Sequence, residues 1–261
     1  EKYPRFIHWS TCGVYGIPKY NSNENGFILE ADESTPCNPL NNYSISKTEQ
    51  EKIIIEFAKS SGLEYTILRS MPIYGPHQTY GMFHVFYMIN KMRSMPLPII
   101  YPKKNKLVMP MVHVEDLVNA ALFLSQNDKA IGEVFNVGGD NVTQEDFLEF
   151  IYQELGINYA IIPIWYPIYK LCGSIASAYI KNENKKARKW GLRPKIDEAM
   201  SEYINHQYYF SNKKIKNLGF QFKYANPFEG VRQTIKWYVN AGWFDQEEFH
   251  LLDKIIKPEE C

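Results

Sequence analysis

Short apolar runs and longer amphipathic segments alternate along the first part of the chain. Residues 5–9 and 65–69 are compact apolar runs, and each predicts a buried strand. Between them, residues 42–61 place apolar side chains at helical spacing, and Gly62 follows as a helix terminator. A strand, a helix and a second strand in this order form one crossover unit of a parallel sheet.

The rest of the chain carries further patterns of the same two kinds. Residues 17–42 are rich in Asn, Pro, Glu and Ser and predict a loop. Helices are predicted over 81–95, after the short strand 112–114, from Thr143 onward and around Trp237, and strands at 134–137 and near 220–222. This alternation predicts a protein of the α/β class.

One stretch, residues 160–180, contains no acidic residue and only Lys170, and a basic segment follows it. Pro163 and Pro167 interrupt the stretch and leave about 13 apolar residues, fewer than the ~20 that a membrane-spanning helix needs. We expect a helix that is buried or covers a pocket. The alternative is a helix in contact with a membrane surface through its apolar side and its basic flank.

Composition and charge exclude several classes of protein. The chain has 261 residues, of which 45% are hydrophobic and 22% charged, so neither general disorder nor a coiled coil is expected. Its 29 basic and 29 acidic residues balance, which gives it no electrostatic reason to bind nucleic acid. Aromatic residues make up 15%, which suits a large core or, as the alternative, a pocket that stacks flat ligands.

The four cysteines, Cys12, Cys37, Cys172 and Cys261, form no C-x-x-C pair and lie near no His cluster. This spacing disfavours a metal site and a redox motif, and we expect free thiols in a cytoplasmic compartment. The chain opens with Glu1, not Met, and enters a core strand almost at once. We therefore expect it to be part of a longer protein.

The candidate catalytic pair is Tyr43 and Lys47. The spacing Y-x-x-x-K by itself is uninformative, because it also occurs at Tyr15/Lys19, Tyr87/Lys91, Tyr166/Lys170 and Tyr209/Lys213. In two of these pairs a proline, Pro18 or Pro167, stands between the partners, which we take to oppose a regular helical turn. Tyr43 and Lys47 alone open a long helix directly after a strand and turn with two hydroxyls, Ser10 and Thr11.

Such a pair has a specific chemistry. Residues i and i+4 share one face of a helix, so a phenol and an ammonium can approach each other. A free Tyr has a pKa of about 10, and a fixed positive charge lowers that pKa by favouring the phenolate. The Tyr can then take a proton from a substrate hydroxyl or return one to a carbonyl.

Five blocks of the chain, in order, resemble the extended short-chain dehydrogenase/reductase superfamily. They read FIHWSTCGVYG, ESTPCNPLNNYSISKTEQEKII, YTILRSMPIYGP, MVHVEDLVNAALF and NLGFQFKYANPFEGVRQTIKWYVNAG. The resemblance covers about residues 5 to 240 and points to the NAD-dependent epimerase/dehydratases and the 3β-hydroxysteroid dehydrogenase-like enzymes.

The resemblance implies a fold and a division of the chain. Residues 1–140 would be the C-terminal half of a doubly wound Rossmann-type sheet, with a substrate-lobe insertion at about 71–110. Residues 141–261 would form a smaller, mostly helical substrate-binding lobe. The family's Gly-rich phosphate loop, expected about a hundred residues before Tyr43, is absent from the printed sequence, so the N-terminal dinucleotide-binding half would be missing.

The resemblance also implies roles for individual residues. Tyr43 would be the acid/base, Lys47 would hold the ribose hydroxyls of NAD or NADP, and Thr11 would hold the substrate oxygen. Cofactor contacts would include Met71 and Pro72, and substrate contacts Ser10 and His77. His113 and Asp116 match a family pattern whose role we interpret as structural.

The function implied is an NAD(P)-dependent oxidoreductase, present here as a fragment, that acts on a secondary alcohol or ketone. Pro72 stands where sugar-nucleotide epimerases commonly carry Asn, which favours the steroid-type branch over a nucleotide-sugar epimerase or dehydratase. A non-catalytic binding subunit is the other alternative. The expected partners are a small-molecule substrate, a second copy of the chain through the helix bearing Tyr43, and a membrane surface through residues 160–180.

Overall fold

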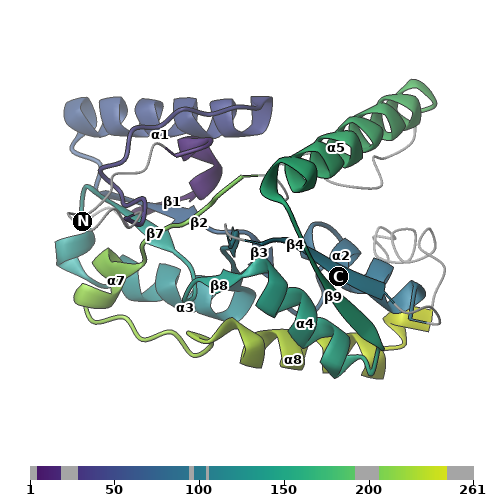
Figure 1. The fold of residues 1–261 in the computed structure, drawn as a ribbon. Helices are drawn as coiled ribbons and strands as arrows, with labels where there is room; N and C mark the ends of the chain where they lie inside the picture. Colours follow the sequence, from purple (N-terminus) through teal and green to yellow (C-terminus); the bar gives the residue numbers. More distant parts are fainter. Residues whose placement is uncertain (1–4, 19–28, 94–96, 104–105, 192–205, 246–261) are drawn as a thin grey trace. The chain divides into compact units, whose positions relative to one another are not determined.

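The structure is a computed structural model that describes residues 5–18, 29–93, 97–103, 106–191 and 206–245 (Figure 1). The chain divides into two compact units. Unit 1 comprises Glu1–Ile73, Leu107–Thr143 and His206–Pro227, and unit 2 comprises Tyr74–Lys106, Gln144–Asn205 and Phe228–Cys261.

Unit 1 is built on a parallel sheet. Its strands are β1 (Phe6–Thr11), β2 (Tyr65–Ser70) and β7 (Glu133–Val137), in the spatial order β1–β2–β7. Helix α1 (Asn42–Ser61) connects β1 to β2, with the bounds that the sequence pattern predicts. The register pairs Thr11 with Ser70 and Ser70 with Val137, so the three strands end level at their carboxyl ends.

Helices cover both faces of this sheet. Helix α1 lies on one face, and α3 (Val114–Ser125) and the short α7 (Lys213–Asn217) lie on the other (Figure 1). Strand β2 is accordingly buried on both sides, as the central strand of a parallel sheet should be. The apolar core under the α3 face comprises Leu68, Val112, Leu117, Ala120, Ala121, Leu124, Ala130, Phe135, Val137, Ile215, Phe220 and Phe222.

Shorter elements complete unit 1. They are the 3-10 helices η1 (Cys12–Tyr15) and η2 (Asp128–Ala130), and the two-residue strands β3 (Ile73–Tyr74, at the unit boundary), β5 (Val108–Met109), β6 (Val112–His113) and β8 (Val142–Thr143). Strands β5 and β8 pair antiparallel.

Unit 2 is mostly helical. Its helices are α2 (Met82–Lys91), α4 (Gln144–Glu154), α5 (Tyr166–Lys189), α8 (Pro227–Asn240) and η3 (Trp243–Asp245), and its strands β4 (Leu97–Pro102) and β9 (Tyr159–Ile164) pair in parallel. Aromatic rings form the core around Tyr238, whose hydroxyl donates to the carbonyls of Gly75 and Gln78 at 3.1 and 3.0 Å. Phe83 packs edge-on against the Tyr238 ring.

The predicted α/β class with a Rossmann-type parallel sheet is confirmed, but two local predictions are wrong. The helix predicted over 81–95 is shorter, Met82–Lys91. No strand forms at 220–222: Phe220 and Phe222 enter the core of unit 1 from irregular backbone. The Asp116 carboxylate accepts the next two backbone N–H groups, of Lys223 and Tyr224, at 2.7 and 2.9 Å, and so fixes this turn without a strand partner.

The domain boundary predicted at residue 140 also needs a change. Residues 206–227 belong to unit 1, although the sequence analysis places them in the lobe. Their apolar side chains, Ile215 among them, fill the face of the sheet that α3 leaves open beside β7.

The apolar stretch 160–180 is not a single buried helix. It consists of β9 followed by most of α5, where Tyr169 is buried but Ile168, Leu171, Ile175 and Tyr179 are exposed. Pro167 stands in the first turn of α5, where a missing N–H costs no helical hydrogen bond. Tyr166 and Lys170 therefore share one turn, with the ammonium 5.7 Å from the ring centre, so Pro167 does not exclude this pair from a helix as predicted. Lys19 of another excluded pair lies outside the described residues.

Within the described part of the chain, no helix combines the length and the apolar character that crossing a bilayer requires.

Candidate active site

Thr11 is the last residue of β1 and lies at the carboxyl end of the sheet. Its hydroxyl accepts the N–H of Gly13 at 3.1 Å and so caps η1. Successive residues of a strand face opposite sides, and Ser10 is accordingly buried. The Ser10 hydroxyl donates to a Glu51 carboxylate oxygen at 2.5 Å, so it holds the core of unit 1. Of the two hydroxyls, that of Thr11 lies at the strand end and that of Ser10 lies in the core.

Lys47 reaches the same end of β1 from α1. Its ammonium donates to the carbonyl of Trp9 at 2.7 Å, two residues before Thr11. Tyr43 lies one turn earlier on α1, and its side chain is 55% exposed. A side chain in this position is accessible to a bound molecule without any rearrangement of the core.

Two local features fix the start of α1 beside the end of β1. The Asn41 side chain caps the helix by accepting the N–H of Ser44 at 2.9 Å. Gly13 permits close approach, because a Cβ at this position would stand 2.8 Å from the Ser44 hydroxyl and 3.4 Å from that of Thr11. The end of β1 and the first turn of α1 therefore lie close together.

A buried charge network, which the sequence analysis missed, lies beneath this junction. Glu51, one turn after Lys47 on α1, binds Arg69 of β2 through two oxygens at 2.7 and 3.0 Å. Arg69 also donates to the Tyr15 hydroxyl at 2.8 Å, and Tyr15 donates to the side-chain oxygen of Asn136 on β7 at the same distance. A charged residue near the end of a mostly apolar, buried strand, as Arg69 is, is the sequence signal for such a buried partner.

Two other ionisable groups of this network, Cys12 and Tyr15, are held neutral. Burial raises the pKa of the Cys12 thiol and of the Tyr15 hydroxyl well above their ordinary values, against the opposing effect of Arg69. Cys12 is therefore a protonated core residue and not a nucleophile. Burial likewise raises the pKa of Glu33, whose carboxylate accepts the N–H of Asn136 at 2.7 Å.

Met71 and Pro72, the predicted cofactor contacts, directly follow the end of β2. The Met71 side chain is buried, and it occupies the space over Gly138, where a Cβ would stand 1.9 Å from its sulfur. The Pro72 carbonyl accepts the N–H of Val112 at 2.9 Å. Only the partly exposed ring of Pro72 is open to a ligand in this segment.

His77, the predicted substrate contact, belongs to unit 2. It is the one described residue other than glycine with a positive φ, 65°, and its ring lies 4.3 Å from that of Trp237. His113 and Asp116 have the structural role expected of them. His113 caps α3 by accepting the N–H of Glu115 at 3.3 Å, and buried Asp116 holds the turn at Lys223.

The early glycines serve packing and not phosphate binding. Gly16 has φ 61°, and a Cβ there would stand 1.9 Å from the Asn38 carbonyl oxygen. Gly13 is closed off by Ser44. The residues present thus fit the nicotinamide-ribose end of a dinucleotide, through Lys47 and Tyr43, and neither glycine is left to approach a pyrophosphate.

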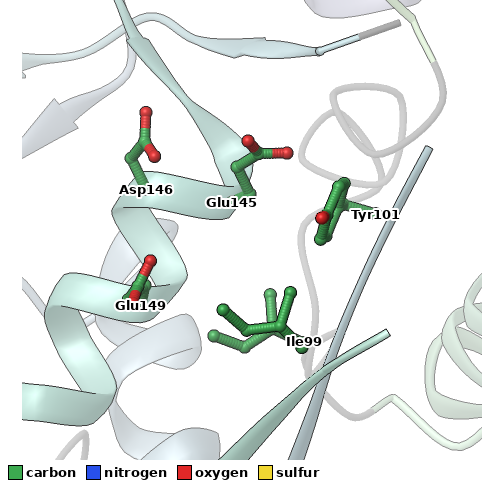
Figure 2. Close-up of a pocket in the computed structure, with 6 residues that line it drawn as sticks. Ile99, Tyr101, Glu145, Asp146 and Glu149 are labelled. Atoms are coloured by element: carbon green, nitrogen blue, oxygen red, sulfur yellow. The ribbon is translucent and has the colours of Figure 1, made fainter. Parts of the chain in front are cut away.

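A small hollow in unit 2 is a poor candidate site. It has a volume of about 60 Å³, which is room for about two water molecules. Glu145, Asp146 and Glu149 line it from α4, and Ile99 and Tyr101 line it from β4 (Figure 2). Glu145 pairs with Lys106, and Glu149 accepts the Tyr159 hydroxyl at 2.7 Å. No group of His, Cys, Asp and Glu among the described residues is arranged to hold a metal ion.

A family model and curated relatives match this chain. The model of the family described as "NAD dependent epimerase/dehydratase family" matches residues 1–138, just over half of the chain. A dTDP-glucose 4,6-dehydratase of Salmonella typhimurium is 28% identical over 245 residues, which cover 92% of this chain and 59% of the dehydratase.

Solved structures share the fold. A UDP-glucose 4-epimerase of Thermotoga maritima, solved with UDP-glucose, has a TM-score of 0.61 at 22% identity and is matched over 91% of this chain and 64% of its own. A dTDP-glucose 4,6-dehydratase of Bacillus anthracis in complex with NAD has a TM-score of 0.61 at 21% identity, over 92% of this chain and 63% of its own. The chain therefore spans about three fifths of the length of these relatives.

Proposed function

The chain belongs to the NAD-dependent epimerase/dehydratase family, and on that premise we propose that it supplies the catalytic and substrate-binding part of an NAD(P)-dependent oxidoreductase. The observation that carries the proposal is the junction of β1 and α1. There the Lys47 ammonium stands at the Trp9 carbonyl, with Thr11 at the strand end and Tyr43 one helical turn away.

Each residue of the junction has a defined task. Tyr43 accepts the proton of a substrate hydroxyl on its phenolate oxygen, and Thr11 hydrogen-bonds to the same substrate oxygen. Lys47 holds the ribose hydroxyls of the dinucleotide, and its charge favours the phenolate of Tyr43. The dinucleotide, when bound, takes up the hydride that leaves the carbon, so a secondary alcohol becomes a ketone. In the reverse direction Tyr43 returns the proton.

A nucleotide sugar is the proposed substrate class. The named relatives act on UDP- or dTDP-glucose according to their names, and they outweigh the argument from Pro72 for a steroid. Pro72 has no side-chain donor, so the sugar must find its hydrogen bonds elsewhere, Thr11 being one source. The cofactor is NAD or NADP.

The test is turnover of UDP-glucose and dTDP-glucose by the protein expressed from its complete reading frame, with and without Tyr43→Phe. We expect the substitution to lower kcat by about two orders of magnitude or more, in line with loss of a general acid/base. Tyr166→Phe is the matched control, because Tyr166 also precedes a lysine by one helical turn, and it should retain activity. Unchanged kcat in Tyr43→Phe contradicts the proposed role, and no turnover by the wild type supports the non-catalytic binding subunit.

We also propose a cytoplasmic location and the pairing of two copies of the chain. The described cysteines, Cys12, Cys37 and Cys172, are free thiols, which suits a cytoplasmic location. Helix α1 exposes Ile53 and Phe57, which suits pairing with a second copy through this helix. Light scattering on Phe57→Ser tests the pairing, and a wild type that remains monomeric contradicts it.

A further inference from the structure

Helix α5 carries an apolar stripe that the described residues of unit 2 leave uncovered. Ile168, Leu171, Ile175 and Tyr179 recur at intervals of three and four residues, and each is between 50% and 64% exposed. The buried residues of α5 are Tyr169, Gly173 and Asn184, which lie on the opposite side of the helix. One side of α5 therefore packs, partly against β4, while the apolar side faces outward.

The stripe has an aromatic residue at each end. Trp165 precedes the helix and Trp190 follows it, and both are at least 70% exposed. The 24 residues of α5 extend over about 36 Å. Exposed tryptophan beside an apolar stripe is typical of helices that lie in the plane of the boundary between lipid and water.

The charge of α5 is strongly one-sided. Between Tyr166 and Lys189 the helix has six basic residues and one acidic residue, Glu183, although the whole chain is neutral. Exposed Lys181 and Lys185 lie along one edge of the stripe, and Lys186 and Lys189 continue it toward Trp190. The cations therefore border the apolar surface and extend it.

We propose that α5 docks on an anionic membrane surface, with its stripe in the lipid headgroup region and its lysines against the lipid phosphates. The helix combines an apolar face, a polar and basic remainder, and too little apolar length to span a bilayer. Pairing with the α5 of a second copy fits less well, because that helix offers only Glu183 to meet these cations and Glu183 already pairs with its own Lys186. The docking is independent of the proposed enzymatic function and holds the protein at the membrane without anchoring it irreversibly.

The first test is co-sedimentation of the printed chain with vesicles of phosphatidylcholine alone or mixed with phosphatidylserine. Binding to the mixed vesicles only, weakened by added salt, is the expected result. Leu171→Ser and Ile175→Ser should each weaken binding by about tenfold, because each removes a side chain that lipid would cover. Leu122→Ser is the control, since Leu122 is 56% exposed on α3, and it should leave binding unchanged.

A second set of variants tests the charge. Lys181→Gln and Lys185→Gln should each weaken binding to the anionic vesicles by about fivefold, while Lys129→Gln, an exposed lysine outside α5, should not. Circular dichroism checks that every variant keeps its helix content.

Two outcomes overturn the docking. One is a wild type that ignores anionic vesicles. The other is a dimer, measured by light scattering, that Ile175→Ser dissociates while vesicle binding is absent, because a second copy would then cover the stripe. Neither measurement needs dinucleotide or substrate, so the result is separable from the fate of the proposed enzyme activity.

Discussion

The ion pair between Glu51 and Arg69 should be the most sensitive point of unit 1. Glu51 is 4% exposed and Arg69 is 7% exposed, and the pair ties α1 to β2. Glu51→Ala removes three hydrogen bonds at once, two from Arg69 and one from the Ser10 hydroxyl. The guanidinium stays behind in the core without its carboxylate.

The cost can be worked out from this geometry. Removing one partner of a buried pair leaves a charge that neither water nor protein compensates, at about 3–5 kcal/mol. That is a large part of the roughly 5–15 kcal/mol that stabilises a typical domain. In the double variant Glu51→Leu with Arg69→Met no charge remains, so it should be more stable than either single variant.

Urea unfolding, followed by tryptophan fluorescence, measures these free energies. A double-mutant cycle then gives the coupling between the two side chains, which we expect to reach about 2 kcal/mol or more. The control is Lys52→Ala, which breaks the exposed pair with Glu49 on the same helix and should have little effect. If Glu51→Ala were as mild as Lys52→Ala, or if the two core substitutions simply added, the network would not be what holds α1 in place.

Three further predictions concern the backbone, the pH dependence of stability and the cofactor. Gly16→Ala should lower the free energy of unfolding in urea by several kcal/mol, because φ is 61° and the Asn38 carbonyl occupies the position of the new Cβ. Gly62→Ala is the control: its φ is also positive but the space around it is open, so it should lower the free energy of unfolding by less. Burial, and after it the charge of Lys47, lower the pKa of His8 in the folded protein. The free energy of unfolding should therefore be highest above pH 6.5, about the pKa of His in the unfolded chain, and should fall as the pH drops below that value. His8→Gln should flatten this fall, and an unchanged pH profile in the variant would contradict the role of His8. The printed chain should bind NAD weakly or not at all in calorimetry, because it contains no Gly-rich phosphate loop, and micromolar affinity would refute this.

Local signals in the sequence determined the elements that position the site. Helix α1 runs from Asn42 to Ser61 as its apolar spacing and Gly62 indicate, and β2 extends the predicted run by one residue. Strand β1 was predicted at 5–9 but continues through Ser10 and Thr11, which the sequence pattern placed in a turn. A capped helix and a buried strand depend on neighbours within a few residues, so a pattern of that length is enough to find them. The order of these elements also sufficed to predict the parallel crossover.

Tertiary structure decided which side chains meet and which faces stay open. The partner of Glu51 is Arg69, 18 residues away, and nothing in α1 itself predicts that choice. Phe220 and Phe222 read as a strand but pack as irregular chain, because Asp116, more than a hundred residues earlier, holds their turn. The sequence pattern predicts that Ile168, Leu171 and Ile175 of α5 are buried, but these side chains are exposed. Burial of an apolar side chain depends on whether another part of the chain packs against it, and a local pattern does not determine that.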